Sequence, residues 1–140
     1  MNGKAFEEVD ISGDVGLRIR GNSLSDLFTN AAYGLYHLVV NGSLIETGTT
    51  ISIDAEGESL EGLLIAFLNE LIYHMDTHGF IGKKVIIHRI DQNSVNATIE
   101  GEEFTGRGHE WKLLLKAATY HDVHVKENDG NWSAFVMFDI

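Results

Sequence analysis

The sequence predicts an α+β fold, a two-layer sandwich in which two amphipathic helices pack on a mostly antiparallel or mixed sheet. Three observations support this prediction. Two stretches repeat apolar residues at helical spacing, several shorter stretches alternate apolar and polar residues as strands do, and turn signals separate adjacent strands. Because each helix needs a surface that covers its apolar stripe, a layer of helices on a layer of strands follows.

Both predicted helices have an apolar stripe and a start signal. The first begins after Ser23, which can cap it with Asp26 three residues later, and it stops at Asn41-Gly42. The second begins after Ser59 and ends at Gly79. The first stripe consists of Leu24, Leu27, Phe28, Ala31, Ala32, Leu35 and Leu38, and the second of Leu60, Leu63, Leu64, Phe67, Leu68, Leu71, Ile72 and Met75.

The strand predictions come from alternation and from turns. Apolar and polar residues alternate in 15–19, 51–55 and 95–99, and 85–87 is a β-branched run. Asp91-Gln92-Asn93 predicts one hairpin turn, and Asn128-Asp129-Gly130-Asn131 predicts another that joins 123–126 to 132–138. The stretch 111–120 combines helix-forming residues with an alternation of Leu113, Leu115 and Ala117, so both possibilities stay open.

Composition limits the function classes. A chain of 140 residues fits one domain, so we expect a single domain over 1–140. With 21 acidic residues against 10 Lys plus Arg, the formal net charge is −11, which favours cations or a basic protein partner over broad nucleic-acid binding. The chain has no cysteine, so Cys-based zinc sites and disulfides are excluded. No signal peptide or membrane-spanning stretch is visible, and we expect a cytoplasmic protein.

Two groups of histidines are candidate metal ligands. Glu70, His74 and His78 follow one another at intervals of four on the second helix, but they drift from its polar side towards its apolar stripe. We therefore favour a partly exposed helix flank over a zinc site. His121 and His124 point to opposite faces of a regular strand, and we expect His121 to be a partly buried, hydrogen-bonded histidine.

Two aspartates could bind a cation. Asp14 begins a predicted strand, and Asp139 ends the apolar strand 132–138, directly before Ile140 with the carboxylate expected at the chain's end. Hard cations such as Ca²⁺ and Mg²⁺ prefer oxygen ligands of this kind. From the residues alone, a Gly-Asp turn and a loose chain end are the simpler interpretations.

The whole chain resembles the archease family in length, order of elements and four short motifs. These are Ile11-Ser12-Gly13-Asp14-Val15-Gly16, the Leu-rich segment 60–76 that ends in Asp76, His109-Glu110 followed by Lys116-Ala117-Ala118-Thr119-Tyr120-His121, and Phe138-Asp139-Ile140. The first motif departs from the family, which has a histidine where this chain has Ile11.

The resemblance implies an accessory protein and no enzymatic activity of its own. Archeases assist an RtcB-type, GTP-dependent RNA ligase in tRNA splicing and RNA repair, by promoting its guanylylation and its multiple turnover. It also implies a metal site at Asp14, Asp139 and Ile140, with Ca²⁺ expected first and Mg²⁺ or Mn²⁺ as alternatives. Lys116, together with His121 and His109, is implied as a functional or partner-binding residue.

Two other functions stay open. One is a metal-dependent phosphoesterase that uses Asp14 and Asp139 with a histidine base, for which His121 and His109 are the candidates. The other is a chaperone-like interaction domain without a metal.

Overall fold

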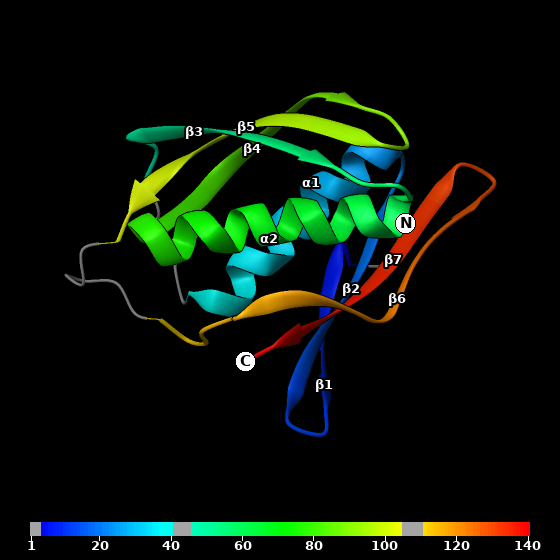
Figure 1. The fold of residues 1–140 in the computed structure, drawn as a ribbon, viewed down its shortest axis with the longest axis horizontal. Helices are drawn as coiled ribbons and strands as arrows, with labels where there is room; N and C mark the ends of the chain where they lie inside the picture. The colour runs from blue at the N-terminus through cyan, green and yellow to red at the C-terminus, as the bar shows by residue number, and fades with distance from the viewer. Residues whose placement is uncertain (1–3, 41–45, 105–110) are drawn as a thin grey trace.

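The computed structural model describes residues 4–40, 46–104 and 111–140, and it contains two helices and seven strands in these ranges (Figure 1). In chain order the elements are β1 (Phe6–Ile11), β2 (Asp14–Gly21), α1 (Leu24–Val39), β3 (Thr49–Glu56), α2 (Leu60–His78), β4 (Phe80–Ile90), β5 (Ser94–Glu103), β6 (Ala117–Asn128) and β7 (Asn131–Asp139). Apart from β1, which the sequence did not predict, each element overlaps a predicted one.

The strands form two antiparallel sheets, with the orders β1-β2-β7-β6 and β3-β5-β4. Both helices pack between these sheets: α1 contacts β2 and β4, while α2 contacts β3 and β6 (Figure 1). The α+β class and the antiparallel pairing are confirmed, and the strands divide between two sheets that the sequence did not separate. Buried side chains from both sheets and both helices form one hydrophobic cluster, which does not include Phe135 and Met137 of β7.

Both predicted helix starts are confirmed. The Ser23 hydroxyl accepts a hydrogen bond from the Asp26 N–H at 3.0 Å, and the Asp26 carboxylate accepts one from the Asn22 N–H at 2.9 Å. Ser59 caps α2 by accepting from the Gly62 N–H at 3.0 Å. Gly79 ends α2 with φ of 66°, a left-handed conformation that glycine adopts without strain. α1 ends at Val39, and the predicted stop at 41–42 lies outside the described residues.

The two predicted hairpin turns are also confirmed. Asp129 and Gly130 both have positive φ, 54° and 83°, as a two-residue turn between antiparallel strands requires. Between β4 and β5, the Asp91 carboxylate accepts hydrogen bonds from the N–H groups of Asn93 and Ser94.

The structure resolves the open question in 111–120 in favour of extended chain. Trp111 pairs with Val40 in an isolated bridge, the next residues are irregular, and β6 begins at Ala117. The Lys112 N–H donates to the Val39 carbonyl at 2.8 Å and holds this segment against the end of α1. Within the described ranges, neither helix is long and apolar enough to cross a membrane.

Candidate functional site

The candidate site is the edge of the four-stranded sheet where β2 begins and β7 ends. Val15 pairs with Phe138, so the next residues along the two antiparallel strands are Asp14 and Asp139. Continuing the register places these two aspartates opposite one another. On its other side Asp139 pairs with Ala117 of β6. The sequence could not show that Asp14 and Asp139 are neighbours.

Both aspartates lie on the outer face of this sheet. Val15 and Phe138 are buried in the core, and side chains alternate between the faces of a strand, so Asp14 and Asp139 point away from the core. Both are exposed. Ile140 follows directly and is 42% exposed. Two carboxylates and a main-chain oxygen of Ile140 therefore lie at one exposed edge.

Ile11 belongs to the same row across the sheet. It pairs with Asp14 across the two-residue turn Ser12-Gly13, in which both residues have positive φ, 46° and 90°. Cross-strand partners lie on the same face, so the Ile11 side chain, 41% exposed, stands beside that of Asp14. The position where the resembling family has histidine thus lies next to Asp14, and here it offers no ligand atom.

Lys116 lies at the same edge, whereas the position of His109 falls outside the described residues. The Lys116 N–H donates to the Asp139 carbonyl at 2.8 Å, which fixes the backbone of Asp139 against the start of β6. The Lys116 side chain is exposed.

The expectation that His121 is partly buried is wrong. Its side chain is 75% exposed and lies 3.3 Å from the Asp122 carboxylate. The reason is a bulge in β6: the register with β7 shifts between Thr119 and His124, and Asp122 has φ of 57°. His121 lies beyond Thr119, outside the row of Asp14 and Asp139 where a hydrolase would need its base.

Among the described residues, no group of three or more His, Asp or Glu side chains is arranged to hold a metal ion. The rings of His74 and His78 lie 6.1 Å apart. His74 is half-buried and His78 is exposed, in keeping with the partly exposed helix flank expected there. Asp14, Asp139 and the Ile140 oxygen supply only hard oxygen donors. This donor type fits Ca²⁺, Mg²⁺ or Mn²⁺, although three donors underfill a shell of six to eight that is typical of Ca²⁺.

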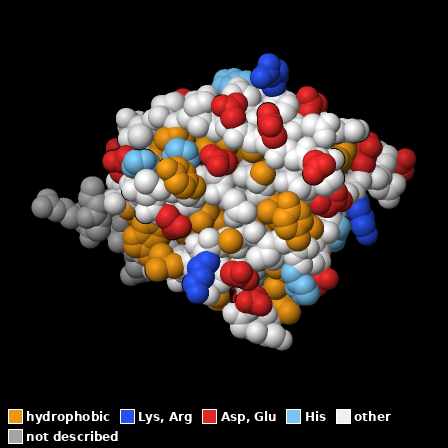
Figure 2. Space-filling view, in the orientation of Figure 1, with side chains coloured by type: hydrophobic (Ala, Val, Ile, Leu, Met, Phe, Trp, Pro, Cys, Tyr) orange, Lys and Arg blue, Asp and Glu red, His pale blue; other side chains and the backbone are white. Residues whose placement is uncertain are grey.

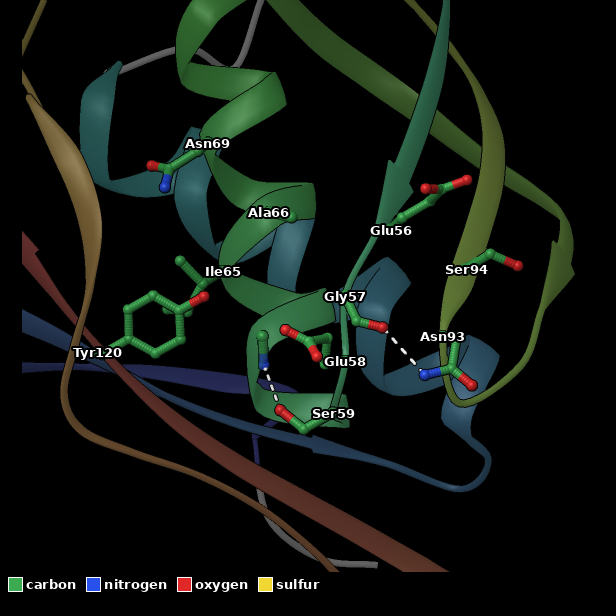
Figure 3. Close-up of a pocket in the computed structure, with 11 residues that line it drawn as sticks. Glu56, Gly57, Glu58, Ser59, Ile65, Ala66, Asn69, Asn93, Ser94 and Tyr120 are labelled. Carbon is green, nitrogen blue, oxygen red and sulfur yellow. Dashed lines mark hydrogen bonds between the residues drawn. The ribbon is translucent and has the colours of Figure 1, made fainter.

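A cleft that the sequence did not reveal lies over the first turns of α2 (Figure 3). It has a volume of about 840 Å³, and Tyr120 from the bulge of β6 forms part of its wall. The Asn69 side chain accepts from the Ala118 N–H at 2.8 Å and donates to the Ala118 carbonyl at 3.3 Å, which holds β6 against α2. Asn93 donates to the Gly57 carbonyl on the opposite side.

Comparison with known proteins decides the family. The profile of the archease protein family (MTH1598/TM1083) matches residues 6–140. The chain belongs to the archease family. Protein archease of Pyrococcus furiosus is 36% identical, covering 98% of this chain and 99% of that protein. Protein archease of Aeropyrum pernix is 34% identical and covers 92% of each.

Solved structures agree with this assignment to the archease family. The solution structure of Methanobacterium thermoautotrophicum protein 1598 is 31% identical, with a TM-score of 0.77, and covers 97% of this chain and 99% of that one. The crystal structure of a Thermotoga maritima archease, described as a possible chaperone, has a TM-score of 0.67 over 96% of each chain. At 20% identity, the second structure supports the archease fold alone.

Proposed function

We propose that this archease is a cytoplasmic accessory protein that binds a divalent cation at Asp14, Asp139 and Ile140 and promotes guanylylation and multiple turnover of an RtcB-type RNA ligase. Ca²⁺ is the first expectation, with Mg²⁺ or Mn²⁺ as alternatives. The single observation that carries the proposal is the register that brings Asp14 and Asp139 to one exposed sheet edge.

The number of donors supports a site that works together with a partner. Two carboxylates and one main-chain oxygen leave several positions of a Ca²⁺ shell to water or to groups of another protein. Because Asp14 and Asp139 are exposed, such groups can approach them directly. We therefore expect modest affinity in the free protein and tighter binding at the ligase interface.

The charge of the molecule supports a protein partner over RNA. Figure 2, which views the molecule from the side shown in Figure 1, shows acidic side chains scattered over the surface and few Lys and Arg side chains among them. The formal net charge of −11 repels phosphate backbones and attracts a basic protein surface. In this proposal the ligase holds the RNA, and the archease acts on the ligase.

The test is ligase guanylylation, measured as transfer of labelled GMP from GTP to an RtcB-type ligase in the presence of each variant. We expect Asp139→Asn and Asp14→Asn to lose the stimulation. The matched control is Asp129→Asn, an exposed aspartate in the turn between β6 and β7, at the opposite end of β7 from Asp139. If folded Asp139→Asn stimulates the ligase as well as Asp129→Asn does, the proposal is wrong.

A further inference from the structure

One edge of the four-stranded sheet has no further strand beside it among residues 4–40, 46–104 and 111–140. Within these residues β1 pairs with β2 alone and forms the outer strand. The opposite edge, β6, is held by α2, because the Glu61 carboxylate accepts from the Val125 N–H at 3.2 Å and the Asn69 amide binds Ala118. In the described part of the chain, no hydrogen bond from a helix reaches the backbone of β1.

The register identifies which groups of β1 face outwards. The Arg20 N–H donates to the Ala5 carbonyl at 2.9 Å, so residues 5 and 20 form a hydrogen-bonded pair. Such pairs alternate along an antiparallel ladder, and the backbone groups of Phe6, Glu8 and Asp10 therefore point away from β2. These three residues present N–H and C=O groups to an additional strand.

The side chains along this edge are acidic. Glu7, Glu8 and Asp10 are all exposed, and only Glu7 has an ion pair among the described residues, with Arg18 at 3.3 Å. A cleft of about 640 Å³ runs along the start of the strand and is lined by Lys4, Ala5, Phe6, Glu7, Glu8 and His37. Figure 1 shows β1 at the periphery of the molecule.

We propose that β1 accepts an extended segment of a partner protein that carries alternating Lys or Arg residues, which adds to the sheet as a fifth strand. Main-chain bonds to Phe6, Glu8 and Asp10 supply the affinity, and the carboxylates of Glu8 and Asp10 select basic side chains. The outer edge of β1 lies on the opposite side of this strand from Asp14 of β2. Binding of a strand there therefore does not require a bound cation.

The probe is a short synthetic peptide that alternates lysine and valine, titrated into the whole labelled protein and followed by nuclear magnetic resonance. We expect the amide signals of Phe6, Glu8 and Asp10 to shift and these amides to exchange more slowly with solvent. A peptide of identical sequence with alternate amides N-methylated keeps the charge but cannot form the ladder, and we expect it not to bind.

Charge reversal gives the matched comparison. The double variant Glu8→Lys/Asp10→Lys should weaken peptide binding by roughly tenfold, because cross-strand attractions become repulsions. Glu127→Lys, an exposed glutamate on the opposite edge strand, should weaken it less than about twofold. Equal losses for the two variants, equal binding of the N-methylated peptide, or shifts away from β1 each overturn the proposal.

The alternative role for charged residues on an edge strand is to prevent self-association of the protein. In that case Glu8→Gln/Asp10→Asn forms dimers while wild-type protein shows no ladder-specific peptide binding, and this outcome also overturns the proposal. If the lysine variant does not fold, the milder Glu8→Gln/Asp10→Asn change and the pair of peptides decide the question, with a loss of affinity of a few fold expected.

Discussion

Asp14 and Asp139 stand at the ends of neighbouring antiparallel strands, one residue beyond the pair formed by Val15 and Phe138. Both side chains are exposed and lie on the face opposite the core. Like charges directly opposite one another destabilise a sheet, so this arrangement has a cost unless a cation or a basic group lies between them. That cost gives the metal proposal a test that needs no ligase.

Replacing either aspartate should change metal binding and stability in opposite directions. We expect Asp14→Asn to lose the heat of Ca²⁺ binding in calorimetry and, without metal, to raise the free energy of unfolding by about 0.2–1 kcal/mol through relief of repulsion. Wild type should be stabilised by added Ca²⁺ because binding favours the folded state. Thermal unfolding with Ca²⁺ and with a chelator measures both effects.

The control is again Asp129→Asn, which removes one exposed carboxylate at the opposite end of β7 from Asp139. It should retain the full Ca²⁺-dependent increase in melting temperature. If Ca²⁺ stabilises Asp14→Asn and Asp129→Asn equally, the cation binds elsewhere or diffusely, and the assignment to Asp14 and Asp139 fails.

Introducing a histidine at position 11 should change metal preference. Ile11→His places an imidazole beside Asp14, in the same row across the sheet. Imidazole suits Zn²⁺ and Ni²⁺, whereas carboxylates suit Ca²⁺ and Mg²⁺. We therefore expect Zn²⁺ affinity to rise by roughly tenfold with little change for Ca²⁺, as measured by competitive calorimetry. Val9→His, two residues away on the same face, should show no such gain, and an equal gain there would contradict the prediction.

Local signals explain why much of the fold was predictable. The helix starts at Ser23 and Ser59 and the stop at Gly79 depend on caps that form within a few residues, and the structure has the predicted bonds. The turn at 128–131 likewise depends on Asp129 and Gly130 adopting positive φ. Short-range chemistry of this kind can be read from a single sequence.

The remaining features depend on long-range packing. β1 is rich in acidic residues, and buried and exposed residues do not alternate along it. Its sequence therefore lacks the alternation that predicts a strand. The bulge that exposes His121 follows from the way β6 pairs with β7 and packs on α2, which periodicity does not encode. The proximity of Asp14 and Asp139 follows from the order of strands in the sheet. Local sequence patterns indicate strands but do not indicate which strands become neighbours.

Two tyrosines of α1 should respond oppositely to loss of the hydroxyl. The Tyr36 side chain is buried and its hydroxyl has no hydrogen-bond partner among the described residues, whereas the Tyr33 hydroxyl accepts from the Val85 N–H at 3.1 Å. We expect Tyr36→Phe to raise the free energy of unfolding by about 1 kcal/mol and Tyr33→Phe to lower it by a similar amount. Urea unfolding measures both, and a loss of stability in Tyr36→Phe would contradict this account.

The same hydroxyl predicts a change at alkaline pH. Burial raises the pKa of Tyr36 far above its usual value of 10.0. The unfolded chain therefore releases this proton at lower pH than the folded protein does, and wild-type stability falls as pH rises above 10. Tyr36→Phe lacks this contribution, so its stability advantage over wild type should widen across that range. A constant stability advantage would show that Tyr36 ionises over the same pH range in the folded protein as in the unfolded chain.

The turn at Asp91 predicts the opposite dependence at acid pH. Its carboxylate accepts hydrogen bonds from the N–H groups of Asn93 at 2.8 Å and Ser94 at 2.9 Å, and these bonds lower its pKa below the usual 3.8. A lowered folded-state pKa gives stability that is present above the usual value and is lost as pH falls through the folded one. Asp91→Ala should therefore be less stable than wild type at neutral pH, with a difference that shrinks below pH 3.8.

Urea unfolding over a pH series checks this, with Asp91→Asn as the control. Asparagine keeps an acceptor oxygen for the two backbone donors but does not titrate. Its stability relative to Asp91→Ala should therefore stay constant with pH, while that of wild type falls towards Asp91→Ala in acid. If the gap between wild type and Asp91→Ala persists at the lowest pH at which both fold, the carboxylate charge at Asp91 does not stabilise the turn.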